Sequence, residues 1–374
     1  MLRLALLTIA FSRVVSLLHQ SPLVGRVQYG NGAIQTPHDG TTSLQASTVA
    51  DSSTYRQFID AVDVQSASFT VPRTRTAKAT DRKRVALLVC PAQLCVANDY
   101  KTLFDNLALF DDDLSVDISK SSTAAPLCRK GWMGVARNLH RKEFFQGNLP
   151  VQSTLKEYFQ SIERGLAQIF DAEGPDINIC IVGHSIGGWV ARAYLGGMSQ
   201  QNGVSSELHR LALKQCSSYI TLGTPHIAPE DAPVDQTRGL IRQIEQNPNC
   251  HPEVLASRGI DITCVCSRAI TQENYAGDVE GLLAAHSYLP MTGLRTDVEG
   301  DGIVPLEMAF LDSPAKRVVL DKCSLTGKGI RHSHVVPTPW NLWDSKASSM
   351  HLPAHDFPSY VSRGVVGQWA HHIK

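Results

Sequence analysis

One serine between two glycines, at the junction of an apolar run and a helical segment, constrains the fold most. Residues 183–187 read Gly183-His184-Ser185-Ile186-Gly187; they follow the apolar run 177–182 and precede a segment, 188–195, with the composition of a helix. Strand, tight turn and helix in this order are the context of a nucleophile elbow. A side chain at either glycine would crowd the neighbouring strand or helix. The segment therefore predicts a strained turn on which the serine hydroxyl is clear of the backbone.

A glycine-rich turn between a strand and a helix can also serve only for packing, or it can bind phosphate. The phosphate alternative is weak, because neither G-x-x-x-x-G-K-[ST] nor G-x-G-x-x-G stands here. We therefore interpret Ser185 as the nucleophile of an acyl transfer from an ester or amide. The first amides of the following helix would point at the group that it attacks.

Apolar runs alternate with helical patterns over most of the chain, which indicates an α/β fold. The expected strands are 85–90, 114–118, 177–182, 218–222, 260–266 and 317–320, and the expected helices are 100–109, 153–170, 188–195 and a last one near 365–369. Such alternation is typical of a mostly parallel, doubly wound sheet with helices on both faces. The irregular stretch 126–150, which carries several aromatic residues, is either a small cap or lid or a loop packed on the core.

The N-terminal part differs from the rest. Residues 1–20 have a positive start and a short apolar stretch, as in a signal peptide, and 21–83 are rich in Ser and Thr with a basic end. We expect 1–20 to be signal-like, 21–83 to be a disordered, transit-like linker and 84–374 to be an α/β-hydrolase domain. This combination suits a plastid reached through the secretory route, and the alternative is the ER or secretion.

Charge and cysteine spacing limit the partners and cofactors. The chain has 35 basic and 35 acidic residues, which argues against a nucleic-acid partner because no basic excess is present. No C-x-x-C pair occurs among the nine cysteines, so we expect neither a zinc site nor a redox dithiol. A disulfide between distant cysteines stays open. Acyl transfer through a serine needs no metal or organic cofactor, and we expect none.

A serine nucleophile needs a histidine base and an acid that orients it, and in α/β-hydrolases the order is serine, acid, histidine. The best acid downstream is Asp301, between two glycines and followed by the apolar Ile303 and Val304; Asp297 is the second choice. The base should follow the last strand, where His332 and His334 are both near. Their position alone does not separate them.

The oxyanion hole needs two backbone donors. One should be the amide of Ile186, directly after the nucleophile. The other should come from the loop after the first strand, where Ala92 and Gln93 are candidates.

Five motifs in a fixed order then resemble a known family, the plant and algal α/β-hydrolase esterases and lipases, distantly similar to GPI inositol-deacylases. The motifs are Pro91 through Asn98-Asp99-Tyr100, Gly183 through Arg192, Leu222-Gly223-Thr224-Pro225-His226, Gly300-Asp301-Gly302-Ile303-Val304-Pro305 and Gly329-Ile330-Arg331-His332-Ser333. The resemblance implies Ser185 as nucleophile, Asp301 as acid and the histidine of the last motif, His332, as base, with His334 as the alternative.

This sequence departs from the family in the loop after the first strand, where a glycine-rich stretch is usual. Here the loop reads Pro91-Ala92-Gln93-Leu94-Cys95, and we expect its backbone to use ordinary φ and ψ while it offers the Gln93 amide.

The expected function is hydrolysis of carboxylic esters of a hydrophobic, lipid-like substrate, with peripheral membrane contact as a further expectation. Alternatives are a plastid esterase of chlorophyll-type phytyl esters, an acyltransferase with the same triad, and a catalytically silent hydrolase fold that binds a ligand or partner. The sequence carries no signal for an oligomeric state.

Overall fold

A computed structural model describes residues 82–110, 113–128, 142–200, 206–228, 235, 237–271, 279–292, 295, 297–336 and 349–374. The signal-like segment 1–20, all but the last two residues of the linker 21–83 and most of the expected cap at 126–150 lie outside the described residues.

Within the described part, the central sheet has the strand order β2-β1-β4-β5-β6-β9, with β3 paired to β1, and all its pairings are parallel. The strands are β1 (Lys83–Cys90), β2 (Val116–Ile118), β3 (Thr123–Ala124), β4 (Asn178–His184), β5 (Cys216–Leu222), β6 (Asp261–Ser267) and β9 (Lys316–Leu320). All six strands expected from the sequence are present, and the α/β-hydrolase assignment is confirmed. The missed β3 has only two residues, too short for a periodic pattern.

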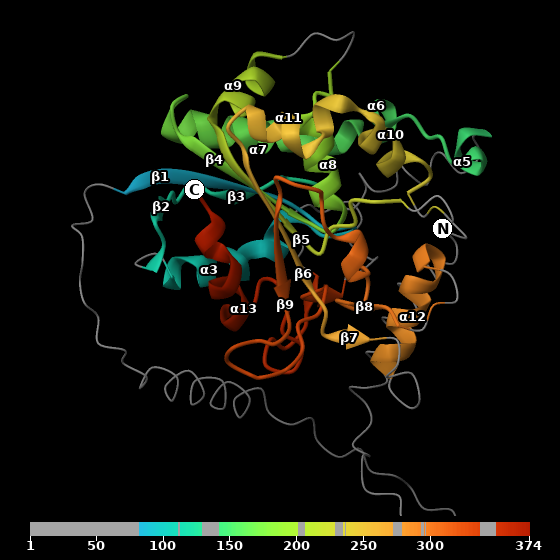
Figure 1. The fold of residues 1–374 in the computed structure, drawn as a ribbon. Helices are drawn as coiled ribbons and strands as arrows, with labels where there is room; N and C mark the ends of the chain where they lie inside the picture. Colours follow the sequence, from blue (N-terminus) through green and yellow to red (C-terminus); the bar gives the residue numbers. More distant parts are fainter. Residues whose placement is uncertain are drawn as a thin grey trace, which may run out of the picture. The chain divides into compact units, whose positions relative to one another are not determined.

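Helices cover both faces of this sheet (Figure 1). One face carries α7 (Lys156–Glu173), α8 (Ile186–Leu195), α9 (Glu207–Gln215), α10 (Leu240–Gln246) and α11 (Pro252–Ser257); the other carries α3 (Lys101–Leu109) and α13 (Arg363–Trp369). The sheet can be apolar on both sides because successive residues of a strand point to opposite faces. In β1, for example, Leu88 packs toward α7 and α8, and Leu87 packs toward α3 and α13.

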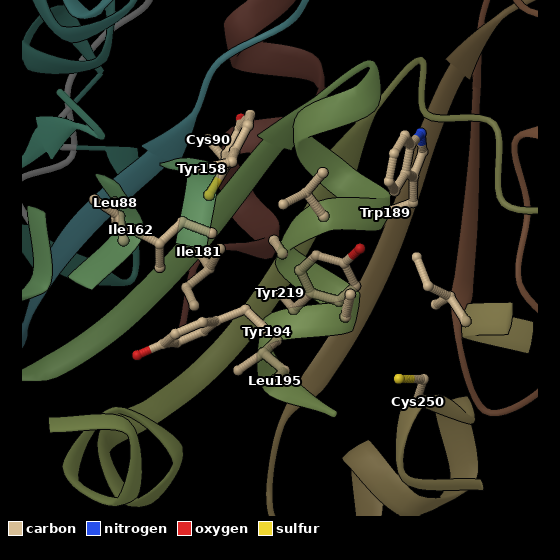
Figure 2. Close-up of a cluster of buried hydrophobic side chains, with 14 of the residues drawn as sticks. Leu88, Cys90, Tyr158, Ile162, Ile181, Trp189, Tyr194, Leu195, Tyr219 and Cys250 are labelled. Carbon is tan, nitrogen blue, oxygen red and sulfur yellow. The ribbon is translucent and has the colours of Figure 1, made fainter. Parts of the chain in front are cut away.

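The core under α7 and α8 fixes the helix that follows the serine. Figure 2 shows Tyr158 and Ile162 of α7 and Trp189 of α8 among strand side chains such as Leu88 and Ile181. Every one of these side chains is at most 4% exposed. Burying a large apolar side chain contributes about 1.5–3 kcal/mol, so α8 is held firmly against the sheet.

Further described elements lie outside the central sheet and the helices named above. These are α5 (Lys142–Gln146), α6 (Val151–Thr154), β7 (Ile270–Thr271), α12 (Val279–Thr292), β8 (Glu299–Gly300), β10 (Val335–Val336) and β11 (Met350–His351), with short 3₁₀ turns at Ala97–Tyr100, Pro248–Cys250, Leu306–Met308 and Ala370–His372. Strand β8, which pairs antiparallel with β7, directly precedes Asp301, and β10 begins directly after His334.

The cysteines bear on the disulfide that the sequence left open. All nine cysteines are free thiols, so this disulfide is absent from the described residues.

In the described part of the aromatic stretch 126–150, Phe144 packs in the core with 4% exposure and Phe145 is 75% exposed. Among the described helices, none is both long and apolar enough to cross a membrane.

Candidate active site

Ser185 lies between β4 and α8 on a strained turn. Its φ of 55° and ψ of −129° are rare for a residue with a side chain, and such strain concentrates at functional sites. The Ser185 N–H donates to the Leu222 carbonyl at the end of β5, 2.9 Å away. The turn is therefore tied to the next strand as well as to its own.

The two glycines of the motif have the steric role that the sequence predicts. A Cβ at Gly187 would overlap the carbonyl of Cys90 and lie 2.7 Å from that of Pro91, at the end of β1. A Cβ at Gly183 would overlap the backbone of Gly188 in α8. The sharp turn thus depends on close approach of backbone to backbone at both positions.

The predicted acid and base contact each other directly. His332 Nδ1 lies 2.8 Å from Asp301 Oδ2, and the side chains are 7% and 0% exposed. The His332 N–H also donates to the Asp301 carbonyl at 2.9 Å. A carboxylate in this position selects the tautomer with the proton on Nδ1 and leaves Nε2 unprotonated, the form that a general base requires.

The carboxylate of Asp301 accepts four hydrogen bonds. Oδ1 accepts from the amides of Ile303 (3.1 Å) and Val304 (2.8 Å), while Oδ2 accepts from His332 Nδ1 and from the Tyr360 hydroxyl (2.7 Å). These donors satisfy a buried charge that would otherwise be costly. They also fix the direction from which the carboxylate meets the imidazole.

Gly223 packs directly against the Asp301 and His332 side chains. Its φ is +53°, and a Cβ there would overlap Asp301 Oδ2 and lie 3.0 Å from His332 Nδ1. The glycine of the Leu222–His226 motif is thus required by its backbone conformation and by the space that the acid and the histidine occupy.

The second-choice residues have other partners. The Asp297 side chain is 70% exposed and pairs with Arg295, 3.2 Å away. His334 is buried, but its Nε2 donates to the backbone carbonyl of Asp99 at 2.8 Å, and its Nδ1 has no partner among the described residues. Neither residue contacts the Asp301–His332 pair by a hydrogen bond.

Ser185 and this pair lie at the same end of the sheet, where the parallel strands have their carboxyl ends. Its neighbour His184 donates from Nε2 to the His332 carbonyl at 2.9 Å, and the His184 and His332 rings are 5.1 Å apart. No hydrogen bond joins the Ser185 hydroxyl to His332 within the described chain. In unliganded serine hydrolases this contact is often long and shortens when substrate binds.

The amides proposed for the oxyanion hole follow the ends of two neighbouring strands, β1 and β4. Cys90 at the end of β1 pairs with Gly183 at the end of β4, so the Pro91–Cys95 loop adjoins the elbow. The Ala92 N–H donates to the Tyr100 hydroxyl at 2.7 Å and is therefore occupied. Of the two sequence candidates, Gln93 remains, together with Ile186 at the first position of α8, where a helix has unpaired N–H groups.

One expectation for this loop is wrong. Leu94 has a φ of +64°, so the loop does not use ordinary φ and ψ. The Cys95 N–H donates to the Ala92 carbonyl at 3.0 Å, which closes a turn whose third residue is Leu94. Positive φ at the third residue is typical of a type II turn, where glycine usually provides it. The chain adopts the turn without the glycine.

Three residues of this site were missed in the sequence. His184 and Gly223 stand inside motifs that were recognised, yet nothing in the motif letters says what their atoms contact. Tyr360 has no local signal, because it lies in an irregular segment 59 residues from Asp301.

A parallel sheet with helices on both faces and a strained serine between β4 and α8 defines the class as an α/β-hydrolase fold with a serine elbow. Residues 153–232 match the family model described as "Putative serine esterase (DUF676)". This segment contains the elbow and the Leu222–His226 motif, but neither Asp301 nor His332. The match supports a serine hydrolase.

The chain is also similar to a solved structure, the apo form of Thermogutta terrifontis esterase 2. The identity is 11%, the similarity covers 69% of this chain and 76% of that chain, and the TM-score is 0.29. A likeness this distant carries no argument about function. No curated protein matches the chain. The relation to plant and algal lipases and to GPI inositol-deacylases stays a prediction.

Proposed function

We propose that the protein is a carboxylic-ester hydrolase that acts through Ser185, His332 and Asp301 on hydrophobic, lipid-like esters. The observation that supports it most is the 2.8 Å contact of His332 Nδ1 with the buried Asp301 carboxylate, on the sheet edge that also carries the strained Ser185. A histidine oriented by a carboxylate beside such a serine is the arrangement that acyl transfer requires.

In this mechanism Ser185 Oγ attacks the ester carbonyl while His332 Nε2 takes the hydroxyl proton. Asp301 Oδ2 accepts the hydrogen bond from Nδ1–H and stabilises the imidazolium. The amides of Ile186 and Gln93 donate to the oxyanion. His332 then gives this proton to the leaving alcohol. Water, deprotonated by the same nitrogen, attacks the acyl-enzyme, and Nε2 returns that proton to Ser185 Oγ as the acid leaves.

Apolar side chains around these groups support a hydrophobic substrate. Leu94 follows the Gln93 amide, Ile186 follows the nucleophile and Ile303 adjoins Asp301, and all three are partly exposed. Side chains in these places would meet the acyl or alcohol part of a bound ester. Apolar contacts of this kind dominate ligand sites in general.

The test uses the full chain with a fluorophosphonate probe and a series of p-nitrophenyl esters of increasing acyl length. We expect labelling at Ser185, turnover that rises from short to longer acyl chains, and loss of both signals in Ser185→Ala at unchanged circular dichroism. Turnover retained by Ser185→Ala would refute the mechanism, and a preference for the shortest ester would refute the lipid-like substrate. Added alcohols that divert the acyl group would show an acyltransferase.

A further inference from the structure

His184, the variable residue of the Gly183–Gly187 motif, is the last residue of β4 and is 1% exposed. It is a polar side chain in the middle of the site, and the mechanism above does not use it. Its ring centroid is within about 6 Å of four other rings, those of His332 (5.1 Å), His334 (5.7 Å), Tyr100 (5.9 Å) and Tyr360 (6.0 Å).

The hydrogen bonds of the His184 ring have only one consistent direction. The carbonyl of His332 can only accept, so His184 Nε2, 2.9 Å away, carries the proton. Burial, with His332 and His334 nearby, lowers the pKa of His184 well below its usual 6.5. The ring is therefore neutral at pH 7, and its Nδ1 accepts from the Tyr100 hydroxyl at 2.9 Å.

The chain of hydrogen bonds continues beyond Tyr100. The Tyr100 oxygen accepts from the Ala92 N–H at 2.7 Å, in the loop that offers the Gln93 amide. One directed series thus runs from Ala92 through Tyr100 and His184 to the carbonyl of His332. It connects the loop after β1, the end of β4 and the loop that carries the histidine.

The backbone of His332 is consequently held on both sides. Its N–H donates to the Asp301 carbonyl at 2.9 Å and its carbonyl accepts from His184, while its Nδ1 contacts the Asp301 carboxylate. Of the described hydrogen bonds of His332, the one from His184 comes from β4, the strand that precedes Ser185. The other described hydrogen bonds of His332 join it to Asp301.

We propose that His184 is a positioning residue: its ring, by donating to the His332 carbonyl and accepting from Tyr100, sets the base and the oxyanion loop relative to Ser185. This inference rests on the proposed function, because it assigns His184 a role in the same reaction. It predicts an effect on turnover beyond the stability that any satisfied buried side chain provides.

A matched pair of variants isolates the donor. In His184→Gln the side-chain amide nitrogen reaches the place of Nε2 and can donate to the His332 carbonyl. His184→Met has nearly the same length and volume but no donor. We expect His184→Met to lower kcat about 100-fold with KM nearly unchanged, since small misplacements of catalytic groups have effects of this size. His184→Gln should recover at least about tenfold of that loss.

The rates are expressed per site labelled by the fluorophosphonate, so that unfolded protein does not count. Equal kcat values for the Gln and Met variants, or a wild-type kcat in His184→Met, would overturn the proposal. A merely structural side chain would change the labelled fraction and leave the rate per labelled site unchanged.

A second measurement does not depend on esterase activity. Urea unfolding of Tyr100→Phe, His184→Met and the double variant forms a double-mutant cycle. We expect the double variant to lose less stability than the sum of the two, because each single change already breaks the shared bond. If the wild type is neither labelled nor active, the proposed function fails while this cycle still tests the connection. Additive losses would overturn it.

Discussion

Two buried histidines lie two residues apart at the site, and only His332 contacts a carboxylate. His334 instead donates to the backbone carbonyl of Asp99. We therefore expect His332→Gln to lower kcat by about three orders of magnitude or more, the usual range for loss of a general base. His334→Gln should stay within about tenfold of wild type per folded molecule. Steady-state kinetics with one activated ester compares them, and a larger loss in His334→Gln would reassign the base.

The Tyr360 hydroxyl gives a second prediction, because it donates to Asp301 Oδ2 and accepts from the buried Ser267 N–H. Tyr360→Phe should lower the unfolding free energy by about 2 kcal/mol, since a charged acceptor loses a donor and an amide loses its partner. It should also lower kcat roughly tenfold, because the carboxylate is less firmly oriented.

Tyr288→Phe is the matched control for Tyr360→Phe. The Tyr288 hydroxyl contacts the same loop, but it accepts from the Gly302 amide at 2.7 Å and does not touch the carboxylate. We expect this variant to lose stability with little change in kcat. Equal kcat losses in the two variants would show that Tyr360 acts only through the fold of the loop.

These residues also show where sequence reasoning about the site ends. Ser185 and Asp301 could be selected because each stands in a local motif and the fold fixes the order of the triad, which also narrowed the base to His332 or His334. The choice between His332 and His334 needed coordinates or a resemblance, since both follow the same strand. Tyr360 was out of reach because its role depends on a contact across 59 residues.

At the scale of elements, the residue that follows β5 packs closely against the acid and the histidine. A Cβ at Gly223 would overlap Asp301 Oδ2 and lie 2.8 Å from the Tyr360 ring, at a φ of +53°. We expect Gly223→Ala to cost at least about 3 kcal/mol of stability, from backbone strain of about 1–3 kcal/mol plus overpacking. Its kcat per labelled site should fall about 100-fold or more, since the carboxylate must move.

Gly259→Ala separates the two causes. Gly259 also has positive φ, +86°, but nothing lies within 4 Å of a Cβ built there, at the start of β6 away from the serine. This variant should lose about 1–3 kcal/mol of stability and keep the wild-type kcat. Urea unfolding and kinetics on both variants are sufficient. The packing argument would be wrong if Gly223→Ala retained the stability and kcat of Gly259→Ala.

The length and the periodicity of each element decide whether the sequence could predict it. Strands β1, β4, β5 and β6 are buried on both faces and each contains an apolar run, and α7 has a strong helical period, so the sequence indicated these elements. Helices α10 and α11 have seven and six residues, too few for a clear period. The backbone of the Pro91–Cys95 loop was predicted wrongly because the absence of glycine does not exclude positive φ: Leu94 adopts it within a hydrogen-bonded turn.

For the whole molecule, four buried histidines contribute to the dependence of stability on pH. Burial lowers the pKa of His184, His209, His226 and His334, the last to about 4. Each folded-state pKa is below the unfolded value of about 6.5, so between these values the unfolded chain binds more protons. The stability that these four histidines contribute is therefore present above about pH 6.5, and it is lost as the pH falls below that value. Glu245, whose pKa burial raises, opposes this by one proton at most.

His334 allows this to be tested at one group. The groups that act on it are Asp99, which favours its protonation, and His332 and His351, which oppose it, but burial is the largest effect. At up to about 1.4 kcal/mol per pH unit, a fall from pH 7.5 to 5 should cost about 2 kcal/mol through this ring alone. Glutamine does not titrate and can keep the bond to Asp99, so the stability of His334→Gln should fall less by that amount. Urea unfolding from pH 7.5 to 5 measures both curves, and parallel curves would mean that His334 is already protonated in the folded state or accessible to water.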